Sequence, residues 1–277
     1  MQPEESLRTI VSRSAYRFAE CVVMSLKTLL AAACLTLAAL TSAHADEAVL
    51  RIGTEGAYPP FNFIDAKGEL SGFDVDIAKT LCKEMKRQCS FVAVPWVEII
   101  DGLEQNKYDL IVASMAYTEE RAKRIAYSDP YYRSHAVFIG DTQRFTETTP
   151  EALAGARIVA GEGTMHADYL DKVYAARSTV LHAKDQPEAQ AMLEQGKADL
   201  LLADAIDLMS FLENTKNTGF DFIGDPVTND LLQSTSHITA RKSDTALLGE
   251  VNAALKRIRL NGSYDQVNDT YFPFSIY

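Results

Sequence analysis

The chain has 277 residues, with 38 acidic against 27 basic side chains and a formal net charge of -11. This length exceeds what one hydrophobic core usually supports, so two lobes are expected, with a single large α/β unit as the alternative. A composition of 47% hydrophobic and 23% charged residues excludes a disordered chain, a collagen and a multi-span membrane protein. The acidic balance argues against nucleic acid, which requires a basic face, and suits neutral or cationic partners.

Residues 1–45 are predicted to be a leader and signal peptide. Leu29–Leu40 is an uncharged apolar run of 12 residues, and the small-x-small cleavage pattern Ala43–Ala45 follows it. The run is shorter than the roughly 18 to 20 residues that a membrane span requires. We therefore expect cleavage after Ala45, export of the mature chain and a true start at Met24. A long natural n-region and a lipoprotein are the less favoured alternatives.

Two cysteines remain after the predicted cleavage, Cys82 and Cys89. An even pair in an exported chain favours a disulfide, which would pin a helix end to the following strand. Two buried free thiols are the alternative.

The apolar period switches between two and 3.6 residues along the mature chain, which predicts an α/β protein. The expected strands are Val49–Gly53, Phe91–Val94, Leu110–Ala113, Val137–Ile139, Ile158–Ala160 and Leu200–Ala203. The expected helices are one that Asp74 caps, with an apolar stripe from Val75 to Met85, and Ile99–Asn106, Pro187–Gln195 and Thr245–Leu260.

An internal echo relates Leu103–Ser114 to Leu193–Asp204, with eight of twelve positions identical or near-identical. It predicts two similarly built lobes. A weaker echo relates Arg51-Ile52 to Arg157-Ile158, and convergence of helix-turn-strand units could explain that one alone.

Both copies of the longer echo end in a polar residue, Ser114 in the first and Asp204 in the second. Open α/β sheets bind ligands beyond the carboxyl ends of their strands, so these two residues are expected to face a shared cleft. A ligand held between two related lobes favours binding with domain closure over catalysis.

The segment after Ser114 indicates a receptor for an anion. Thr118 is a plausible helix N-cap, so free amides around Ala116 favour an anion, to which Arg121 can add its planar fork. A capped surface helix with an exposed arginine is the alternative. Across the cleft, Asp204 suits an ammonium group, or caps the helix that follows it, or does both. Together these groups predict recognition of a zwitterionic α-amino acid.

Aromatic and acidic side chains indicate the walls of the site. Tyr58 and Trp96 could flank a ligand side chain, although core packing is the default for Trp96. Glu55 could receive a distal cationic group, with a solvated loop glutamate as the alternative.

Catalytic signatures are absent from the sequence. It has no G-x-S-x-G, G-x-x-x-x-G-K-[ST] or H-E-x-x-H pattern, and its histidines have no metal-ligand spacing. We therefore expect no cofactor, no metal site and no enzyme activity. His135 and His237 are interpreted as structural histidines.

Several segments together form a recognisable pattern between Val49 and Tyr277. They are RIGTEGAYPPFNF at residues 51–63, Gly68–Ala78, the C-x6-C pair, T-x-x-R at Thr118–Arg121, Tyr127–Tyr131 and NGSYDQVNDTYF at 261–272. On these segments the chain resembles the bacterial periplasmic solute-binding proteins for polar amino acids (family 3), most of all the lysine/arginine/ornithine- and histidine-binding type that serves ABC importers. The resemblance implies a type II periplasmic binding protein fold, with two mixed sheets flanked by helices and a double hinge. It places lobe 1 at 46–134, lobe 2 at 135–232 and the return to lobe 1 at 233–277.

The resemblance also implies roles by position. Arg121 matches the α-carboxylate ligand, Asp204 the α-ammonium ligand and Glu55 the acid that meets a distal cation. Tyr58 and Trp96 match the aromatic walls. The implied partners are a free amino acid, most plausibly basic, and an inner-membrane ABC permease, for a monomeric protein.

Departures from the family pattern fall inside the pocket. Ala116 stands where relatives often carry a hydroxyl and Met165 where they carry threonine, which leaves backbone amides to hold the carboxylate. Glu55 is one methylene longer than the usual aspartate, and Trp96 is bulkier than the usual phenylalanine. Ser114 matches a backbone or hydroxyl contact.

Three rival functions follow from the same scaffold. One is a binding protein for a neutral or acidic amino acid or an opine-like conjugate. Another is a dehydratase of the arogenate or cyclohexadienyl type, for which the sequence offers no general acid beyond Glu55 and Glu162. The third is a sensory domain, which normally continues into a transmembrane helix.

Overall fold

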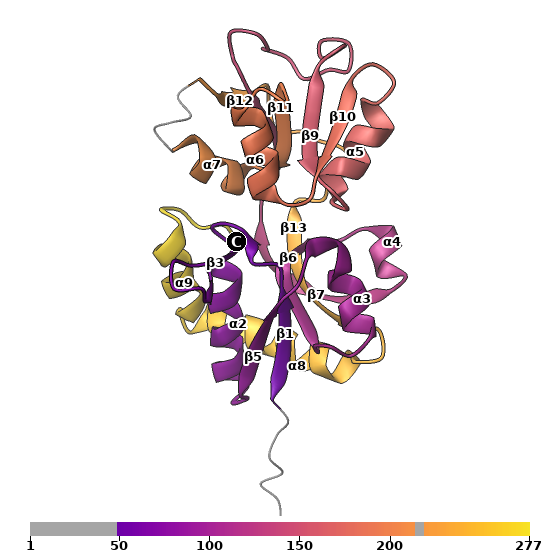
Figure 1. The fold of residues 1–277 in the computed structure, drawn as a ribbon. Helices are drawn as coiled ribbons and strands as arrows, with labels where there is room; N and C mark the ends of the chain where they lie inside the picture. The colour runs from indigo at the N-terminus through magenta and orange to yellow at the C-terminus, as the bar shows by residue number, and fades with distance from the viewer. Residues whose placement is uncertain (1–48, 214–218) are drawn as a thin grey trace, which may run out of the picture. The chain divides into compact units, whose positions relative to one another are not determined.

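The computed structural model describes residues 49–213 and 219–277. The predicted leader, its cleavage site and the start at Met24 lie outside these residues. Within the described ranges, no helix is both long and apolar enough to cross a membrane. The described chain is a mixed α/β structure built on two five-stranded sheets and one small three-stranded sheet, which agrees with the predicted fold class (Figure 1).

The first large sheet, with the helices that cover it, is lobe 1. Its strand order is β5-β1-β6-β13-β7. The bounds are β1 (Leu50–Thr54), β5 (Cys89–Ala93), β6 (Leu110–Ala116), β7 (Ile125–Arg133) and β13 (Thr235–Arg241). β1, β5 and β6 are parallel, whereas β13 runs antiparallel to β6 and β7. A late strand of the chain therefore completes a sheet made from its first part.

The second large sheet, with its helices, is lobe 2, and all of its strands lie between β7 and β13 in the sequence. Its order is β10-β9-β11-β8-β12. The bounds are β8 (Ala136–Gly140), β9 (Arg157–Gly161), β10 (Thr179–Ala183), β11 (Leu200–Asp204) and β12 (Asp221–Ile223). β9, β10 and β11 are parallel, and β8 pairs antiparallel with β11 and β12.

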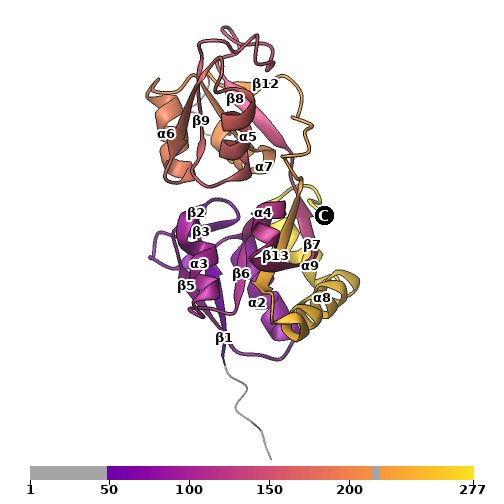
Figure 2. The same cartoon turned by 90° about the vertical axis from the view of Figure 1, so that its right-hand side faces the viewer.

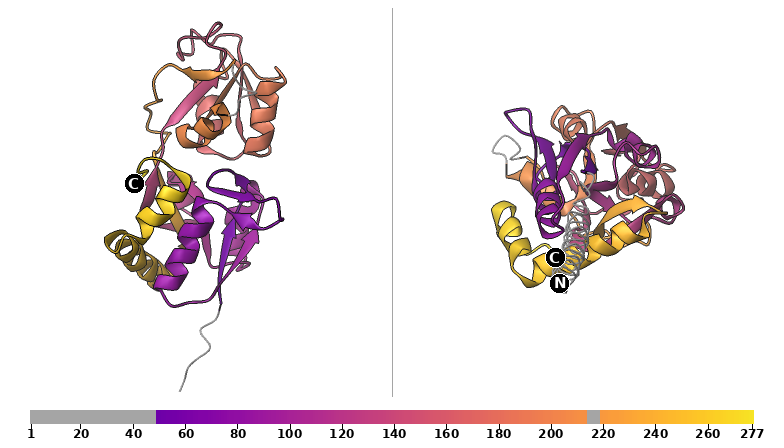
Figure 3. Two further views of the ribbon diagram at one scale, coloured as in Figure 1. Left: turned by 90° about the vertical axis from the view of Figure 1, so that its left-hand side faces the viewer. Right: turned by 90° about the horizontal axis from the view of Figure 1, so that it is seen from below.

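Helices cover both faces of the large sheets. Lobe 1 carries α2 (Phe73–Glu84), η1 (Trp96–Glu98), α3 (Ile99–Glu104), α4 (Glu119–Ala122), α8 (Thr245–Leu260) and α9 (Ser263–Tyr271), with the small sheet of β2 (Ala57–Tyr58), β3 (Asn62–Ile64) and β4 (Leu70–Ser71). Lobe 2 carries α5 (Met165–Val173), α6 (Gln186–Glu194) and α7 (Ala205–Leu212). In lobe 1, α2, α8 and α9 pack against one another, and α3 lies on the other side of the sheet (Figure 2, Figure 3).

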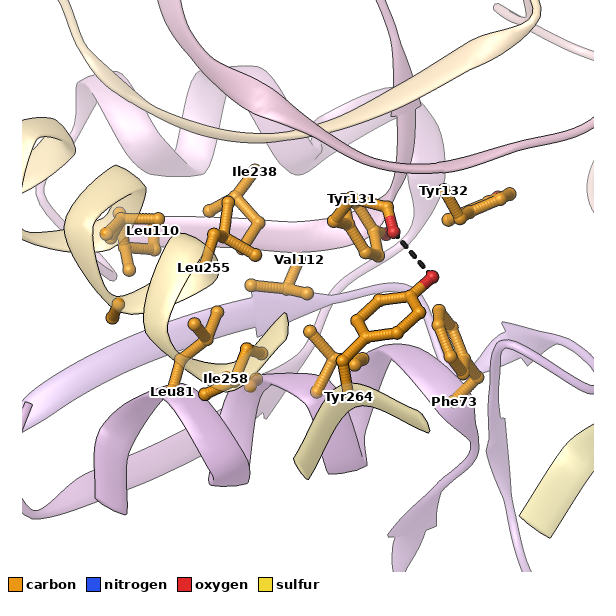
Figure 4. Close-up of a cluster of buried hydrophobic side chains, with 14 of the residues drawn as sticks. Phe73, Leu81, Leu110, Val112, Tyr131, Tyr132, Ile238, Leu255, Ile258 and Tyr264 are labelled. Atoms are coloured by element: carbon orange, nitrogen blue, oxygen red, sulfur yellow. Dashed lines mark hydrogen bonds between the residues drawn. The ribbon is translucent and has the colours of Figure 1, made fainter. Parts of the chain in front are cut away.

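The continuous apolar runs of the sequence form strands that are buried on both faces, as parallel strands usually are. Side chains alternate along β6, so Leu110 and Val112 join the core beneath α2 and α8, while Ile111 and Ala113 join the core beneath α3. Figure 4 shows the first of these cores, where the hydroxyl of Tyr264 donates to the carbonyl of Tyr131 at 2.7 Å.

The two sequence echoes correspond to one repeated arrangement. In lobe 1, Arg51 of β1 donates through its backbone N–H and its guanidinium to Asp109, at 2.8 to 3.1 Å. In lobe 2, Arg157 of β9 makes the same three bonds to Asp199, at 2.9 to 3.0 Å. The weaker echo therefore also reflects a shared structure. In each lobe its arginine pairs with the aspartate of the longer echo, and this pair joins β1 to β6 in lobe 1 and β9 to β11 in lobe 2.

The prediction that Asp74 caps α2 is wrong. The N-cap position is held by Gly72, and Asp74 lies inside the first helical turn, fully buried. Its carboxylate accepts hydrogen bonds from Asn62 Nδ2, Ser114 Oγ and the Tyr131 hydroxyl at 2.6 to 2.9 Å. Burial raises the pKa of Asp74 to about 6 despite these bonds. A polar residue before an apolar stripe looks like a cap in sequence, whereas its partners come from distant segments.

The predicted disulfide is confirmed, since Cys82 and Cys89 are bonded with their Cα atoms 6.2 Å apart. It joins the end of α2 to the start of β5. The chain passes from lobe 1 to lobe 2 after β7 and returns before β13, and the predicted boundaries at 134/135 and 232/233 fall in these passages. There the N–H of Ser134 donates to the carbonyl of Ser234 at 2.9 Å, which ties the two passages together.

Candidate functional site

A cavity lies at the carboxyl ends of β1, β6, β9 and β11, with lining residues from both lobes. Lobe 1 contributes Glu55, Tyr58, Trp96, Ala113, Ser114, Ala116 and Arg121, and lobe 2 contributes Gly161, Glu162, Thr164, Met165, His166, Lys184, Asp185, Gln186, Leu202, Ala203 and Asp204. The structure thus brings every predicted site residue to one cavity.

Arg121 presents its guanidinium to lobe 2. Thr118 is the N-cap of α4, because its hydroxyl accepts from the backbone N–H of Arg121 at 3.1 Å, as predicted. The guanidinium donates through Nη1 to the carbonyl of Ala116 at 3.1 Å and through Nη2 to the carbonyl of Gly163 at 3.0 Å. It also lies over the Trp96 ring, 5.1 Å from its centroid. Burial lowers the pKa of Arg121, but an arginine stays charged at neutral pH.

Trp96 makes a second bond between the lobes, because its Nε1–H also donates to the carbonyl of Gly163 at 3.0 Å. The ring is half-buried and packs at the edge of the core beneath α3. The same residue therefore packs on a core and lines the cavity.

The N-terminus of α5 opens into the cavity beside Arg121. Thr164 is its N-cap, accepting from the N–H of Ala167 at 3.2 Å and donating to the carbonyl of Gly161 at 2.7 Å. Met165 and His166 are the first two residues of this helix, and amides in a first turn have no partner within the helix. Met165 can therefore offer a backbone donor whatever its side chain is.

Asp204 is the last residue of β11 and is 9% exposed. Its backbone takes the N-cap position of α7, but its carboxylate makes no capping bond. Instead, Oδ2 accepts from the hydroxyl of Tyr58 in lobe 1 at 2.7 Å. Of the two roles that the sequence allows, the side chain thus serves the cavity and only the backbone serves the helix.

Glu55 follows β1 and faces an acidic residue of lobe 2. Burial raises its pKa to about 7, and the charge of Asp185 contributes to the rise. Asp185 is the N-cap of α6, where Oδ1 accepts from the N–H of Glu188 at 2.9 Å. Lys184 lies 3.6 Å from the other oxygen of Asp185 but is largely exposed. The lining contains four acidic side chains and two cationic ones, Arg121 and Lys184. The acidic side chains are Glu55, Glu162, Asp185 and Asp204.

Ser114 has a left-handed backbone conformation, with φ of 56°, which is uncommon for a residue other than glycine. Its N–H donates to the Tyr131 hydroxyl at 3.0 Å and its own hydroxyl donates to Asp74 at 2.9 Å. Since both donors are used inside lobe 1, Ser114 offers the cavity acceptor oxygens. Such a group suits an ammonium better than a carboxylate.

Sequence reasoning missed three buried polar residues at this site. His166 lines the cavity with 6% exposure, and Gln186 lines it with the same exposure. Gln186 donates through Nε2 to Asp207 of α7, which is fully buried. Burial raises the pKa of Asp207 well above its usual range, and the charges of Asp204 and Glu55 add to the effect. His166 and Gln186 sit in the first turns of helices that begin at the cleft, which is the signal that could have identified them.

Within the described ranges, no group of three or more histidine, cysteine, aspartate or glutamate side chains has a geometry that could hold a metal ion. The cavity is thus lined by the half-buried Arg121 and helix amides at one place, and by Asp204 with acceptor oxygens at another.

Comparisons with known proteins identify relatives over almost the whole chain. The chain is 34% identical over 256 residues to the L-arginine-binding protein of Pseudomonas aeruginosa, covering 90% of this chain and 97% of that protein. It is 32% identical over 238 residues to ABC transporter arginine-binding protein 1 of Escherichia coli, covering 86% and 96% of the two chains. A Salmonella typhimurium periplasmic binding protein with high arginine specificity has a similar structure, with a TM-score of 0.75 at 29% identity, covering 81% of this chain and 99% of that one.

The sequence pattern shared by one protein family matches residues 50–274, which include every strand of both large sheets and the whole lining of the cavity. The chain belongs to the bacterial extracellular solute-binding proteins, family 3.

Proposed function

We propose that this protein captures a free L-amino acid in the periplasm, most favourably a basic one such as arginine, lysine, ornithine or histidine, and delivers it to an ABC permease. The observation that carries the proposal is that Arg121 from lobe 1 and Asp204 from lobe 2 both line one cavity. These groups are the two charges that a zwitterionic amino acid requires.

The carboxylate of the ligand binds at Arg121 and the start of α5. The guanidinium has five N–H donors, of which two are used by the carbonyls of Ala116 and Gly163. The free amides of Met165 and His166 and the positive end of the α5 dipole add to the anion site. Backbone donors thus replace the hydroxyls that Ala116 and Met165 lack.

The α-ammonium binds at Asp204 and the acceptor oxygens of Ser114. Tyr58 holds Asp204 through Oδ2, which leaves Oδ1 for the ligand. Each charge-assisted hydrogen bond contributes about 1.5–3 kcal/mol, so a handful of them supports micromolar binding, about -8 kcal/mol.

A basic ligand is favoured by the charge of the cavity and supported by the relatives. Glu55 and Asp185 repel one another across the cleft between the lobes, and Lys184, which lies 3.6 Å from Asp185, is largely exposed. A distal guanidinium or ammonium placed there would relieve their repulsion. The two relatives with arginine in their names agree with this choice.

Ligand capture occurs by hinge closure. The passages after β7 and before β13 allow the lobes to move as bodies, and the contacts of Arg121, Trp96 and Tyr58 across the cleft form on closing. The ligand drives closure because it bonds to both lobes only in the closed state.

A thermal-shift screen with the twenty amino acids, ornithine, citrulline and octopine tests this function. Stabilisation by arginine, lysine, ornithine or histidine is expected. Stabilisation by glutamate without any of those four would refute the basic ligand, and no response to any compound would refute amino-acid binding. The dehydratase and sensory alternatives are not favoured, because the family and the named relatives are solute-binding proteins.

A further inference from the structure

His166 is a buried polar residue that none of the interactions above explains. It is the second residue of α5, lines the cavity and is 6% exposed. Its Nε2 atom has no hydrogen-bond partner among the described residues. Buried polar atoms are nearly always paired, so an unpaired one in the wall of a binding cavity indicates a partner that the ligand brings.

The neighbour of this atom is the carboxylate of Asp204. Nε2 lies 3.9 Å from Oδ1 of Asp204, which is too long for a direct hydrogen bond. The other oxygen of Asp204 is taken by the hydroxyl of Tyr58. The 3.9 Å between Nε2 and Oδ1 is short enough for one ligand nitrogen atom to lie about 2.9 Å from both, which is an ordinary hydrogen-bond length.

The charge state of His166 fits an acceptor. Burial lowers its pKa, and the nearby guanidinium of Arg121 lowers it further, while Asp204 has the opposite effect. The imidazole is therefore neutral at pH 7, and a neutral imidazole can accept a hydrogen bond on one ring nitrogen. A charged imidazole would instead repel an ammonium.

We infer that Nε2 of His166 accepts a hydrogen bond from the α-ammonium of the ligand, beside Oδ1 of Asp204. This inference rests on the proposed function and adds to it a residue that sets specificity. The two acceptors together require two N–H donors on the α-nitrogen of the ligand. Because His166 and Asp204 are both buried, little room is left for a substituent on that nitrogen. The site therefore selects amino acids with a free α-amino group over N-substituted conjugates such as opines.

The test measures binding of two probes to three proteins by calorimetry and, for weak binding, by chemical-shift titration. The probes are L-arginine and its deaminated analogue 5-guanidinopentanoate, which lacks the α-ammonium. The proteins are the wild type, His166→Phe, which keeps a buried ring without an acceptor, and His166→Gln, which keeps an acceptor oxygen.

We expect His166→Phe to weaken L-arginine binding by about tenfold or more, the loss of one hydrogen bond to a charged group. The analogue should lose less than about threefold, because it never makes that bond. His166→Gln should bind L-arginine within a few fold of the wild type. Equal losses for both probes, or no loss for L-arginine, would overturn the inference.

A second measurement does not depend on the folding of any variant. In wild-type protein saturated with L-arginine, the 15N chemical shift of His166 Nε2 should be that of an unprotonated, accepting nitrogen. A protonated Nε2 would overturn the inference, because the atom would then be a donor. Wild-type protein that fails to bind L-arginine at all would instead refute the proposed function from which the inference starts.

Discussion

Replacing Asp204 by asparagine removes one charge from the cavity and almost nothing else. The two side chains have the same shape, and the amide oxygen of asparagine can still accept the hydrogen bond from Tyr58 that Asp204 receives at 2.7 Å. What is lost is the charge that meets the α-ammonium in a place that is 9% exposed. A hydrogen bond to a charged group contributes about 1.5–3 kcal/mol, which corresponds to about 10- to 150-fold in the dissociation constant.

Calorimetric titration with L-arginine should therefore show weakening of at least about tenfold for Asp204→Asn. The exposed Asp225→Asn in the same lobe is the matched control, with affinity equal to that of the wild type. The unliganded Asp204→Asn protein should melt no lower than the wild type, because Asp204 adds to the charge repulsion on the buried Asp207. An affinity that matches the control would refute the role of Asp204, and a large fall in melting temperature would show that the residue holds the fold instead.

Three further predictions concern pH, the repeated arginine–aspartate unit and the disulfide. Burial raises the pKa of Glu55 to about 7, so its negative charge is lost as the pH falls through that value. Calorimetry should therefore show that the affinity for arginine falls over the same pH range. The affinity of Glu55→Gln for arginine, and that of the wild type for the neutral probe citrulline, should not change with pH in that range. Hydrogen bonds from Arg157 hold the pKa of Asp199 well below its usual range. The contribution of Asp199 to stability is therefore present above about pH 4 and is lost as the pH falls below that value. Urea titrations of Asp199→Asn should show about 1–3 kcal/mol less stability at neutral pH, and a smaller loss of stability on acidification than the wild type shows. An unchanged urea midpoint would contradict this. Replacing Cys82 and Cys89 by serine should lower the free energy of unfolding by about 2–3 kcal/mol, because the unfolded chain is no longer constrained by the closed loop. The affinity for arginine should stay unchanged, because β5 begins at Cys89, at the end of the sheet away from the cavity. A changed affinity would show that this region is coupled to the site.

Local patterns in the sequence account for much of the fold. The apolar runs at β6 and β11 predict buried strands because side chains alternate to two covered faces, and no long-range information is needed. The longer echo predicts two related lobes because a segment of twelve residues recurs in similar form. In the structure the echo includes the aspartate that anchors each central strand, Asp109 in one copy and Asp199 in the other. Ser114 and Asp204 were expected to end their strands and to share a cleft. Asp204 does end β11, whereas β6 continues two residues beyond Ser114 to Ala116, and both residues line the cavity.

Features that depend on distant partners could not be predicted in the same way. Asp74 looks like a helix cap because its neighbours in sequence are apolar, but its three hydrogen-bond donors come from β3, β6 and β7. Arg121 was expected to add its planar fork to an anion beside the amides around Ala116, whereas in the structure the fork also donates to the carbonyl of Gly163 in the other lobe. The place of His166 in the first turn of α5 is a weak sequence signal, because its unpaired nitrogen matters only once Asp204 is brought within 3.9 Å.

A crystal structure of the protein bound to L-arginine would show which groups of the cavity hold each end of the ligand. We expect one ligand in the cavity, with its carboxylate hydrogen-bonded to Arg121 and the first amides of α5, its ammonium against Asp204 and its guanidinium toward Glu55. A ligand bound with the opposite polarity, or bound outside this cavity, would contradict this arrangement.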